Sequence, residues 1–340
     1  MVTRAVLVGC GSISRTWLRA LRGISQVSVV GLVDLIQDRA QERAQEFGLQ
    51  EALVSSELEQ AVRQTQAEVV FNCTVPEAHH PVALQALELG CHVLTEKPLA
   101  DSLPHAQEMI SAAQRASRIL AVIQNRRYQP EIRLLRQLVE SDAIGKLTTV
   151  NSDFYLGAHF GGFRDHMRHV LLLDMAIHTF DQARFISGAD PVSVYCKEWN
   201  PEGSWYDHDA SAMAIFEMSD GLVYSYRGSW CAEGLNTSWE ADWRLVGTRG
   251  TILWDGSAGI RAERVRAPGG FTSELEEVSL PEFSPGTKVG GHQGVIREFI
   301  ACVQHGQVPE TVASDNIKSL AMVFAAIESA RTHQPVPVRW

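Results

Sequence analysis

The segment DMAIHTFD places Asp174, His178 and Asp181 at steps of four and three residues. On an α-helix, such steps bring side chains onto one face. A carboxylate beside a histidine fixes the tautomer of the ring and stabilises its protonated form, as a general base requires. The spacing therefore predicts that His178 moves a proton and that Asp174 orients it, while Asp181 caps or pairs structurally. A structural histidine or a helix-surface ion pair is the alternative interpretation.

A second group that could act on a hydroxyl is Lys97 in Glu96-Lys97-Pro98, which follows the apolar run 93–95. A bond before proline at the end of a strand is a candidate cis peptide. It would direct Lys97 from the carboxyl edge of a parallel sheet, where doubly wound folds bind their ligands. A cationic lysine at that place favours a developing alkoxide. A solvated lysine in a surface turn is the alternative.

The stretch VLVGCGSIS has the glycine pattern of a phosphate-binding turn. The first glycine permits a tight turn, and the second lets the backbone approach a pyrophosphate. The N-terminus of the helix that follows offers amide donors to the anion. Ser14 stands where glycine or alanine is usual, and it is small enough for close packing. The sequence therefore predicts dinucleotide contacts from Gly9, Gly11, Ser12, Ile13 and Ser14.

The identity of the dinucleotide is indicated by Asp34, at the end of the run VVGLVDL. A carboxylate at this distance from the glycine turn hydrogen-bonds the adenosine ribose diol and repels a 2′-phosphate. Leu35 and Ile36 follow it, where NADP-binding proteins often have Arg, Ser or Lys. We therefore expect NAD rather than NADP. Arg15 and Arg39 are the cations that would work against this preference.

These motifs need strands and helices to position them, and the pattern of the chain supplies both. Short β-branched runs alternate with helical stretches in the first third, at 5–8, 27–33, 69–72, 93–95 and 120–123. This alternation predicts a doubly wound parallel sheet covered on both faces. Later runs joined by hairpins predict an α+β domain with an open, mainly antiparallel sheet. We expect a dinucleotide-binding Rossmann domain at 1–123 and a substrate-binding and oligomerisation domain at 124–340.

Composition narrows the classes of partner. The chain of 340 residues has a net charge of −10, which gives no electrostatic footprint for nucleic acid or anionic lipid. No apolar run approaches the roughly 18 residues of a membrane span, and the N-terminal segment lacks the plan of a signal peptide. The six cysteines form no CxxC pair and no zinc spacing. We expect a cytoplasmic protein that binds a small polyhydroxylated molecule, and neither nucleic acid nor a membrane.

Taken in series, these segments resemble the Gfo/Idh/MocA family, named for glucose–fructose oxidoreductase, inositol dehydrogenase and rhizopine catabolism. The resemblance covers nearly the whole chain. The glycine turn and Asp34 are followed by TVPEAH at 74–79, GCHVLTEKPLA at 90–100, RRYQP, AIGKL, the DMAIHTFD segment and SLAMVFAAIESARTHQPVPV. Such a serial match is far more specific than any one of the motifs.

The resemblance implies hydride transfer between a substrate carbon and C4 of the nicotinamide ring. Lys97 would hydrogen-bond the reacting oxygen, and His178, oriented by Asp174, would exchange the hydroxyl proton. Family members usually associate through the open sheet face of the second domain, which implies a homodimer or homotetramer. The resemblance also implies further contacts with the nucleotide from Thr74, Pro76, His79, Glu96 and Lys97.

The segment before DMAIHTFD departs from the usual family pattern. Many relatives have a Gly-rich run there, whereas this chain has RDHMRHVLLL. Because this segment should border the substrate pocket, we predict that Arg164, His166, Arg168 and His169 bind an anionic or highly hydroxylated ligand. The pair His166-x-x-His169 lacks a glutamate at metalloprotease spacing, so we expect no metal site.

The sequence therefore favours an NAD-dependent oxidoreductase acting on a hydroxyl carbon of a sugar, sugar derivative or cyclitol. Two alternatives keep the same nucleotide turn. A redox-assisted glycosidase with tightly bound NAD would oxidise a sugar carbon transiently, eliminate the aglycone and return the hydride. A non-catalytic NAD-binding regulator would need neither Lys97 nor His178, so the presence of both residues argues against it.

Overall fold

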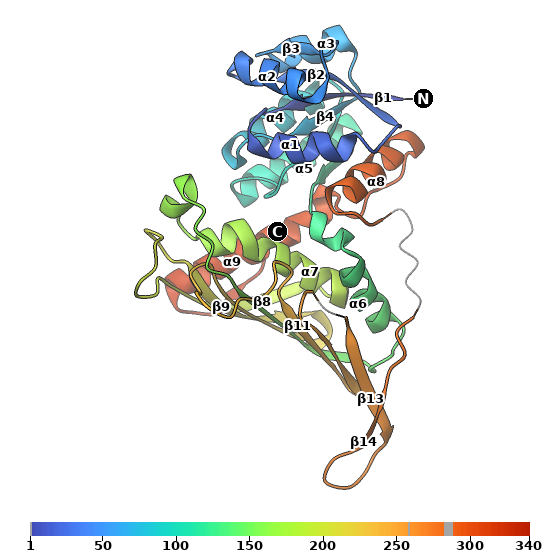
Figure 1. Ribbon diagram of the computed structural model, residues 1–340, viewed down its shortest axis with the longest axis vertical. Helices are drawn as coiled ribbons and strands as arrows, with labels where there is room; N and C mark the ends of the chain where they lie inside the picture. The colour runs from blue at the N-terminus through green and yellow to red at the C-terminus, as the bar shows by residue number, and fades with distance from the viewer. Residues whose placement is uncertain (1, 258, 282–287) are drawn as a thin grey trace. The chain divides into compact units, whose positions relative to one another are not determined.

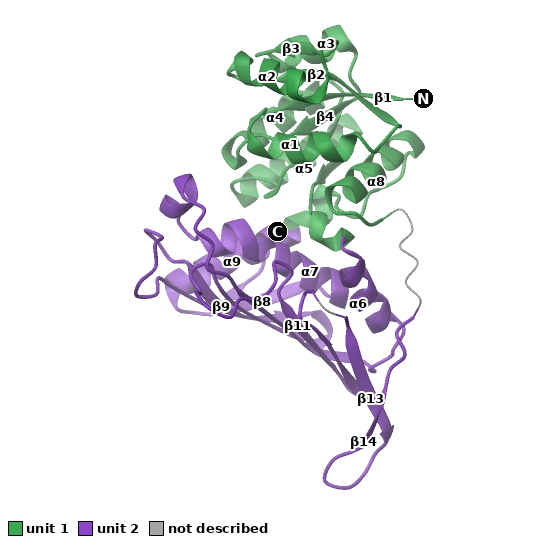
Figure 2. Cartoon of the chain, viewed as in Figure 1, with its two compact units in different colours: residues 1–128, 285–317, 340 green, residues 129–284, 318–339 purple. Residues whose placement is uncertain are grey.

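The computed structural model describes residues 2–257, 259–281 and 288–340. This part of the chain forms two compact units, which Figure 2 shows in different colours. The first contains residues 2–128, 288–317 and 340, and the second contains residues 129–281 and 318–339. The first unit's opening segment therefore ends at residue 128, five residues after the boundary expected after residue 123. Residues 288–317 belong to the first unit rather than to the second domain, because helix α8 (His292–His305) packs against helix α1 (Ser12–Leu21).

The first unit is built on a six-stranded parallel sheet in the order β3-β2-β1-β4-β5-β6 (Figure 1). Leu7 of the central strand pairs with Leu32 on one side and Phe71 on the other. This order confirms the predicted doubly wound fold, in which ligands bind where the strand order reverses, between β1 and β4. The strand β3 is an addition to the prediction. The strands are β1 (Thr3–Val8), β2 (Val27–Val33), β3 (Leu53–Ser55), β4 (Val69–Asn72), β5 (His92–Thr95) and β6 (Leu120–Val122).

Helices of the first unit bury their apolar stripes against this sheet. Trp17 of α1 is fully buried, and its ring lies 5.5 Å from that of Phe71 on β4. Helix α8 adds Phe299 to the same core, which explains its return to this unit. Each such side chain contributes about 1.5–3 kcal/mol when it leaves water. The helices are α1 (Ser12–Leu21), α2 (Gln37–Phe47), α3 (Leu58–Thr65), α4 (Pro76–Glu88), α5 (Leu103–Ala116) and α8 (His292–His305).

The second unit contains a nine-stranded sheet in the order β14-β13-β12-β11-β7-β10-β9-β8-β15. Strands β7 and β10 are parallel, and the other neighbours are antiparallel, so the predicted mainly antiparallel sheet is confirmed. On β10, Tyr224 and Tyr226 are buried while Val223 and Arg227 are exposed, as expected when one face of a sheet packs against helices. The strands are β7 (Leu147–Tyr155), β8 (Pro191–Trp199), β9 (Ser211–Met218), β10 (Val223–Ser229), β11 (Asp242–Gly247), β12 (Gly250–Trp254), β13 (Arg261–Ala267), β14 (Glu274–Glu277) and β15 (Val336–Pro337).

The helix predicted at 171–186 differs from the observed one in its first turns. Leu171–Ala176 form a π-helix, and the α-helix α7 begins only at Ile177 and ends at Ser187. Phe180 of α7 packs against Phe216 and Tyr226 of the sheet, with ring centroids 4.9 and 5.2 Å away. Insertion of a π-turn rotates the residues before it relative to those after it, and such turns are frequent at functional sites. The other helices of this unit include α6 (Pro130–Glu140) and most of α9 (Ala313–Thr332).

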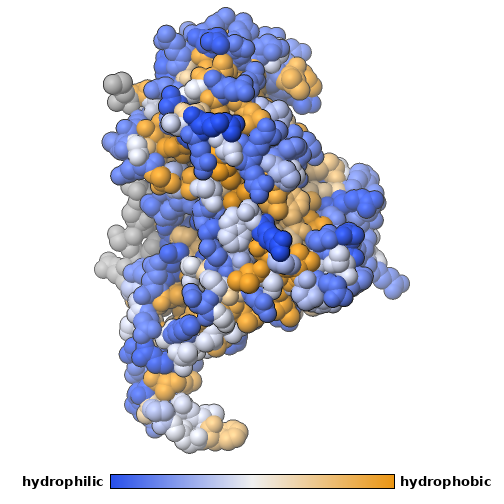
Figure 3. Space-filling model, turned by 180° about the vertical axis from the view of Figure 1, so that it is seen from behind, coloured by the Kyte–Doolittle hydropathy of each residue, from blue (hydrophilic) through white to orange (hydrophobic). Residues whose placement is uncertain are grey.

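The surface is mixed in character. On the face shown in Figure 3, hydrophilic side chains are interspersed with hydrophobic patches. None of the described helices combines the length and the apolar character that a membrane span requires. Five of the six cysteines are buried, and all six are free thiols. Burial raises the pKa of Cys91 to about 11, so its thiol stays protonated and packs as a small apolar group.

Candidate active site

The turn after β1 has the conformation that a phosphate-binding loop needs. Gly9 has a φ of +89°, and a Cβ atom there would lie 2.6 Å from the carbonyl oxygen of Cys73. A side chain at Gly11, in contrast, would meet no described atom within 4 Å. Gly11 precedes α1, whose first turn carries no acidic residue in the described structure. The positive end of this helix is therefore left for an external anion.

Asp34 lies directly after β2 and contacts the same turn. Its Oδ2 accepts a hydrogen bond from the backbone amide of Cys10 (2.8 Å), and its Oδ1 accepts one from the amide of Ile36 (2.9 Å). Leu35, which follows, is 93% exposed. The carboxylate thus connects the ends of β1 and β2, and each of its oxygens retains a second lone pair for a ribose hydroxyl.

The buried guanidinium of Arg43 supports the turn through hydrogen bonds, and the sequence did not indicate this role. Arg43 of α2 is only 4% exposed. Its guanidinium donates to the carbonyl oxygens of Cys10 (3.0 Å) and Gly11 (3.3 Å) and, through Nε, to the hydroxyl of Ser14 (3.0 Å). It also contacts Glu46. Ser14 therefore serves as a hydrogen-bond partner at the position where glycine or alanine is usual.

The loops after β4 and β5 are joined by a buried histidine. His79 is fully buried; its Nδ1 lies 2.7 Å from the carbonyl oxygen of Pro98, and its Nε2 lies 3.1 Å from that of Thr74. Burial lowers the pKa of His79, so the ring is neutral and donates through one nitrogen. Asn72 at the end of β4 accepts from the hydroxyl of Thr74 (2.6 Å). The side chain of His79 thus connects these two loops, and its contact with a nucleotide stays a prediction.

Glu96 likewise supports the backbone at the carboxyl edge of the sheet. Its carboxylate is buried, accepts from the indole N–H of Trp17 (2.7 Å), and accepts from the backbone amide of Lys97 (3.0 Å). Burial raises the pKa of Glu96, but contacts with His292 and Trp17 outweigh this and hold it below its usual value. The peptide bond between Lys97 and Pro98 is cis, as the sequence predicts. An ionised Glu96 therefore holds the backbone of Lys97 at the carboxyl edge of the sheet.

These features fit a dinucleotide. The open space at Gly11, the uncapped helix end and the ribose-binding position of Asp34 follow one another along the carboxyl edge of β1 and β2. Gly9 to Ser14 would hold the pyrophosphate, and Asp34 the adenosine ribose. Pro76, the first residue of α4, follows Thr74 at the same edge of the sheet.

In the second unit, Asp174 is engaged by an arginine. Arg164 donates to both oxygens of Asp174, at 2.8 and 3.3 Å, and its guanidinium lies over the rings of Phe160 and Phe163. Asp174 lies in the π-helix, so the α-helical spacing that placed it in one row with His178 does not hold across this turn. The structure thus gives Arg164 an intramolecular partner, whereas the sequence assigned it to the substrate.

His178 and Asp181 lie in α7 and are both buried. His178 retains 8% exposure, whereas Asp181 has none. Asp181 accepts a hydrogen bond from the hydroxyl of Ser319 (2.8 Å), and Ser319 in turn accepts one from Arg184 (3.0 Å). The expected structural pairing of Asp181 is therefore observed, and it fixes α7 to α9.

Each histidine of the segment 164–169 contacts its own carboxylate. His166 Nδ1 lies 2.6 Å from Asp207, and His169 Nδ1 lies 2.7 Å from Glu198. Within the described residues, no three His, Cys, Asp or Glu side chains gather as a metal site. Arg168 is exposed. The two histidines therefore do not act as one pair, and no motif in the sequence indicates their carboxylate partners.

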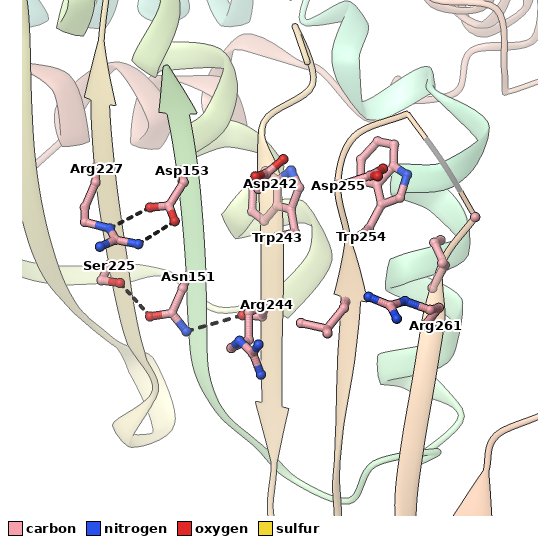
Figure 4. Close-up of a pocket in the computed structure, with 13 residues that line it drawn as sticks. Asn151, Asp153, Ser225, Arg227, Asp242, Trp243, Arg244, Trp254, Asp255 and Arg261 are labelled. Atoms are coloured by element: carbon pink, nitrogen blue, oxygen red, sulfur yellow. Dashed lines mark hydrogen bonds and ion pairs between the residues drawn. The ribbon is translucent and has the colours of Figure 1, made fainter. Parts of the chain in front are cut away.

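The sheet of the second unit also carries a cavity of about 1030 Å³, lined by none of the predicted residues (Figure 4). Arg227 and Asp153 form two contacts there, at 2.6 and 2.5 Å. Asn151 accepts from Ser225 (2.6 Å). The Arg227–Asp153 ion pair and the Ser225–Asn151 hydrogen bond join strands β10 and β7, so they have a structural role within the sheet.

The sequence is similar to known oxidoreductases along its length. Residues 3–124 match a family described as "Oxidoreductase family, NAD-binding Rossmann fold", and residues 132–253 match the "GFO/IDH/MocA C-terminal domain". A D-apiose dehydrogenase from Paraburkholderia graminis is 28% identical, covering 99% of this chain and 90% of its own. Inositol 2-dehydrogenase from Rhizobium meliloti is 22% identical, covering 99% of this chain and 100% of its own.

Solved structures agree in fold. An oxidoreductase from Agrobacterium radiobacter, in complex with NAD+, L-tartaric acid and magnesium, superposes with a TM-score of 0.85 at 22% identity, and the match covers 99% of each chain. At this identity the likeness concerns the fold.

Proposed function

This chain belongs to the Gfo/Idh/MocA oxidoreductase family, with an NAD-binding Rossmann fold, and on that basis we propose that it is an NAD-dependent dehydrogenase. Its substrate class is a sugar, sugar derivative or cyclitol, oxidised or reduced at one hydroxyl carbon. Relatives named D-apiose dehydrogenase and inositol 2-dehydrogenase support this class. A cytoplasmic homo-oligomer is the form we expect.

The observation that carries the proposal is the set of groups at the carboxyl edge of the first sheet. The turn after β1 leaves a helix end open to a pyrophosphate, Asp34 follows β2, and Lys97 follows β5 with its backbone held by Glu96. A regulator that only sensed the nucleotide would not need this buried support for a lysine. The nicotinamide ring, when bound, accepts or supplies the hydride.

Lys97, His178 and Asp174 have separate roles in the proposed reaction. The ammonium group of Lys97 holds the hydroxyl oxygen and favours the alkoxide as the carbon loses hydride. His178 takes the hydroxyl proton and returns it in the reverse reaction. The family resemblance assigns Asp174 to stabilise the protonated ring, although the π-helix removes the α-helical spacing between Asp174 and His178. Arg164 holds Asp174 through two hydrogen bonds. Proton and hydride thus leave the same H–C–O–H unit, and a carbonyl forms.

Recognition of the substrate falls to the segment that departs from the family pattern. Arg168 is exposed and is the cation of this segment best suited to a direct contact, for instance with a carboxylate. His166 and His169, each held through Nδ1, leave Nε2 for a hydroxyl group. Arg164 contributes to recognition only indirectly, because its guanidinium is bonded to Asp174.

A panel of sugars, cyclitols and sugar acids tests the proposal, with the absorbance of reduced nicotinamide as the readout and the Lys97→Met variant as the control. We expect at least one member to yield NADH in equal amount to a carbonyl product, and the variant to yield little. Release of an aglycone from a glycoside without net NADH would overturn the proposal in favour of the glycosidase. So would an absence of NADH with every member in the presence of bound NAD.

A further inference from the structure

His169 has a backbone conformation that is uncommon for residues other than glycine. Its φ is +53°, in the left-handed region, where a side chain crowds the following carbonyl at a cost of about 1–2 kcal/mol. The π-helix begins two residues later, and the carbonyl oxygen of His169 accepts a hydrogen bond from the amide of Leu173 (3.0 Å). The strained residue therefore forms the entrance to the helical segment that carries Asp174.

The side chain that holds His169 in place is a buried carboxylate. Glu198 lies on β8, its side chain is 2% exposed, and its Oε2 is 2.7 Å from Nδ1 of His169. Its other oxygen, Oε1, is buried and has no hydrogen-bond partner among the described residues. A buried carboxylate with one unsatisfied oxygen is costly. Strain and incomplete hydrogen bonding at one place are typical of sites retained for function.

We propose that Glu198 is a positioning residue. By holding the imidazole of His169, it maintains the left-handed turn from which the π-helix starts, and it thereby sets the place of Asp174 and, one turn later, of His178. The role of these two residues rests on the function proposed above. The anchoring of the π-helix by the pair does not depend on it.

The charges around the pair give it a defined dependence on pH. His169 faces Glu198 from β8, Asp209 from the loop before β9, and the neighbouring Arg168. The hydrogen bond to Glu198 raises the pKa of His169 above its usual 6.5, and burial raises the pKa of Glu198. Because both pKa values are raised, the proton between His169 and Glu198 is retained to a higher pH than on an isolated histidine. The ion-pair contribution to the anchor is therefore present below the ordinary pKa of histidine and is lost as the pH rises through the raised pKa of His169, where a neutral ring keeps only the hydrogen bond from Nδ1.

Hydrogen exchange of the full-length protein tests the anchor, with protection factors measured for residues 170–178. We compare Glu198→Gln and His169→Gly with Glu217→Gln, an exposed carboxylate on the same sheet that accepts from Ser193. Glycine adopts a positive φ without strain, so His169→Gly removes the anchor and leaves the turn. We expect both anchor variants to lose protection by roughly tenfold or more, as when one partner of a buried pair is removed, and the control to keep it.

Two further readouts separate positioning from general stability. In Glu198→Gln, kcat should fall more than KM rises, and the alkaline limb of the kcat profile should move to lower pH as the pKa of His169 falls. His169→Asn, which tolerates the left-handed turn and can still bond to Glu198, should recover part of the protection. Wild-type protection in His169→Gly would overturn the proposal, since the turn alone would then suffice. If protection falls but no substrate is oxidised by the wild type, the proposed function fails and the anchor stands.

Discussion

The turn after β1 and the segment 164–178 differ in the groups that they expose: backbone amides at the turn, and side chains in the segment. At the turn, the start of α1 has no side-chain cap, so backbone amides are available to an anion, and Arg43 supports the turn through the carbonyl oxygen of Cys10. In the segment 164–178, the side chains themselves are presented, and Arg164, His166 and His169 are each held by a carboxylate. The first arrangement suits a constant cofactor, and the second allows the substrate to differ between relatives.

This difference has a physical origin. Backbone amides keep their direction as long as the chain keeps its path, so a change of one side chain at the turn matters only through packing. An exposed ion pair such as that of His166 and Asp207 depends on both partners, and each partner can be replaced without altering the fold, whereas Glu198, the partner of His169, is buried. The comparison therefore predicts that variants in the two regions affect different constants.

The largest effects are expected from Lys97→Met and His178→Ala. Methionine keeps much of the lysine volume without the cation, and alanine removes the proton acceptor. Each should lower kcat on the order of 100-fold or more, the scale of general acid–base catalysis. The Kd for NAD should stay within a few-fold, because neither residue is expected to hold the adenine half. Steady-state kinetics and nucleotide titration measure the two constants.

The double variant sharpens this test. Because the proposed mechanism assigns both residues to one hydroxyl, its loss should be far smaller than the product of the single losses. Near wild-type activity of His178→Ala would show that the base is another residue, and His166 and His169 would be tested next.

An intermediate effect is expected at Asp34. NAD should bind at least about tenfold tighter than NADP, because the carboxylate hydrogen-bonds the ribose diol and repels a 2′-phosphate. Asp34→Ser should reduce this ratio. The serine variant should also weaken NAD itself, since the amides of Cys10 and Ile36 lose their acceptor. Asp38→Ser, an exposed acid on α2, removes the same charge and should leave the ratio unchanged. Equal affinities in the wild type would contradict the assignment of NAD.

The smallest effect concerns the support of the turn. Arg43→Met should weaken NAD binding by roughly fivefold, because the carbonyl oxygens of Cys10 and Gly11 lose charged donors, while kcat with saturating NAD stays near that of the wild type. Arg15→Met is the matched control, since Arg15 also binds Glu46 but is 44% exposed. A fall in kcat equal to that in affinity would show that the turn and the chemistry are not separable. Calorimetric titration and thermal unfolding distinguish weaker binding from instability.

Much of the first unit could be predicted from local pattern. The strand at 27–33 and the strand at 69–72 have the predicted bounds, because continuous β-branched runs identify buried parallel strands. Strand β3 showed no pattern, because its three residues, Leu-Val-Ser, include only two apolar side chains. Arg43 could not be identified, since a charged residue on an amphipathic helix ordinarily faces water. Asn72 was visible as a polar residue ending an apolar strand, but its partner Thr74 was not inferred.

In the second unit, the sequence identified the class of the sheet and the structural role of Asp181. It did not indicate the π-turn, because a repeat of three and four residues is compatible with an α-helix until packing of Phe180 against the sheet selects the register. It also assigned Arg164 to the ligand, although Asp174 is its partner in the fold.

What the sequence determined by itself is the chemistry that needs only a few neighbouring residues: the glycine turn, the acid that follows β2, the cis bond before Pro98, and the fold class that their order requires. The tertiary structure alone decided which charges meet. Arg43 reaches the turn from a helix some thirty residues later, and Glu198 reaches His169 from β8. Such pairs depend on the order of strands and the packing of helices, which are set by burial summed over the whole unit. No local spacing encodes that sum, so the partners appear only in the folded chain.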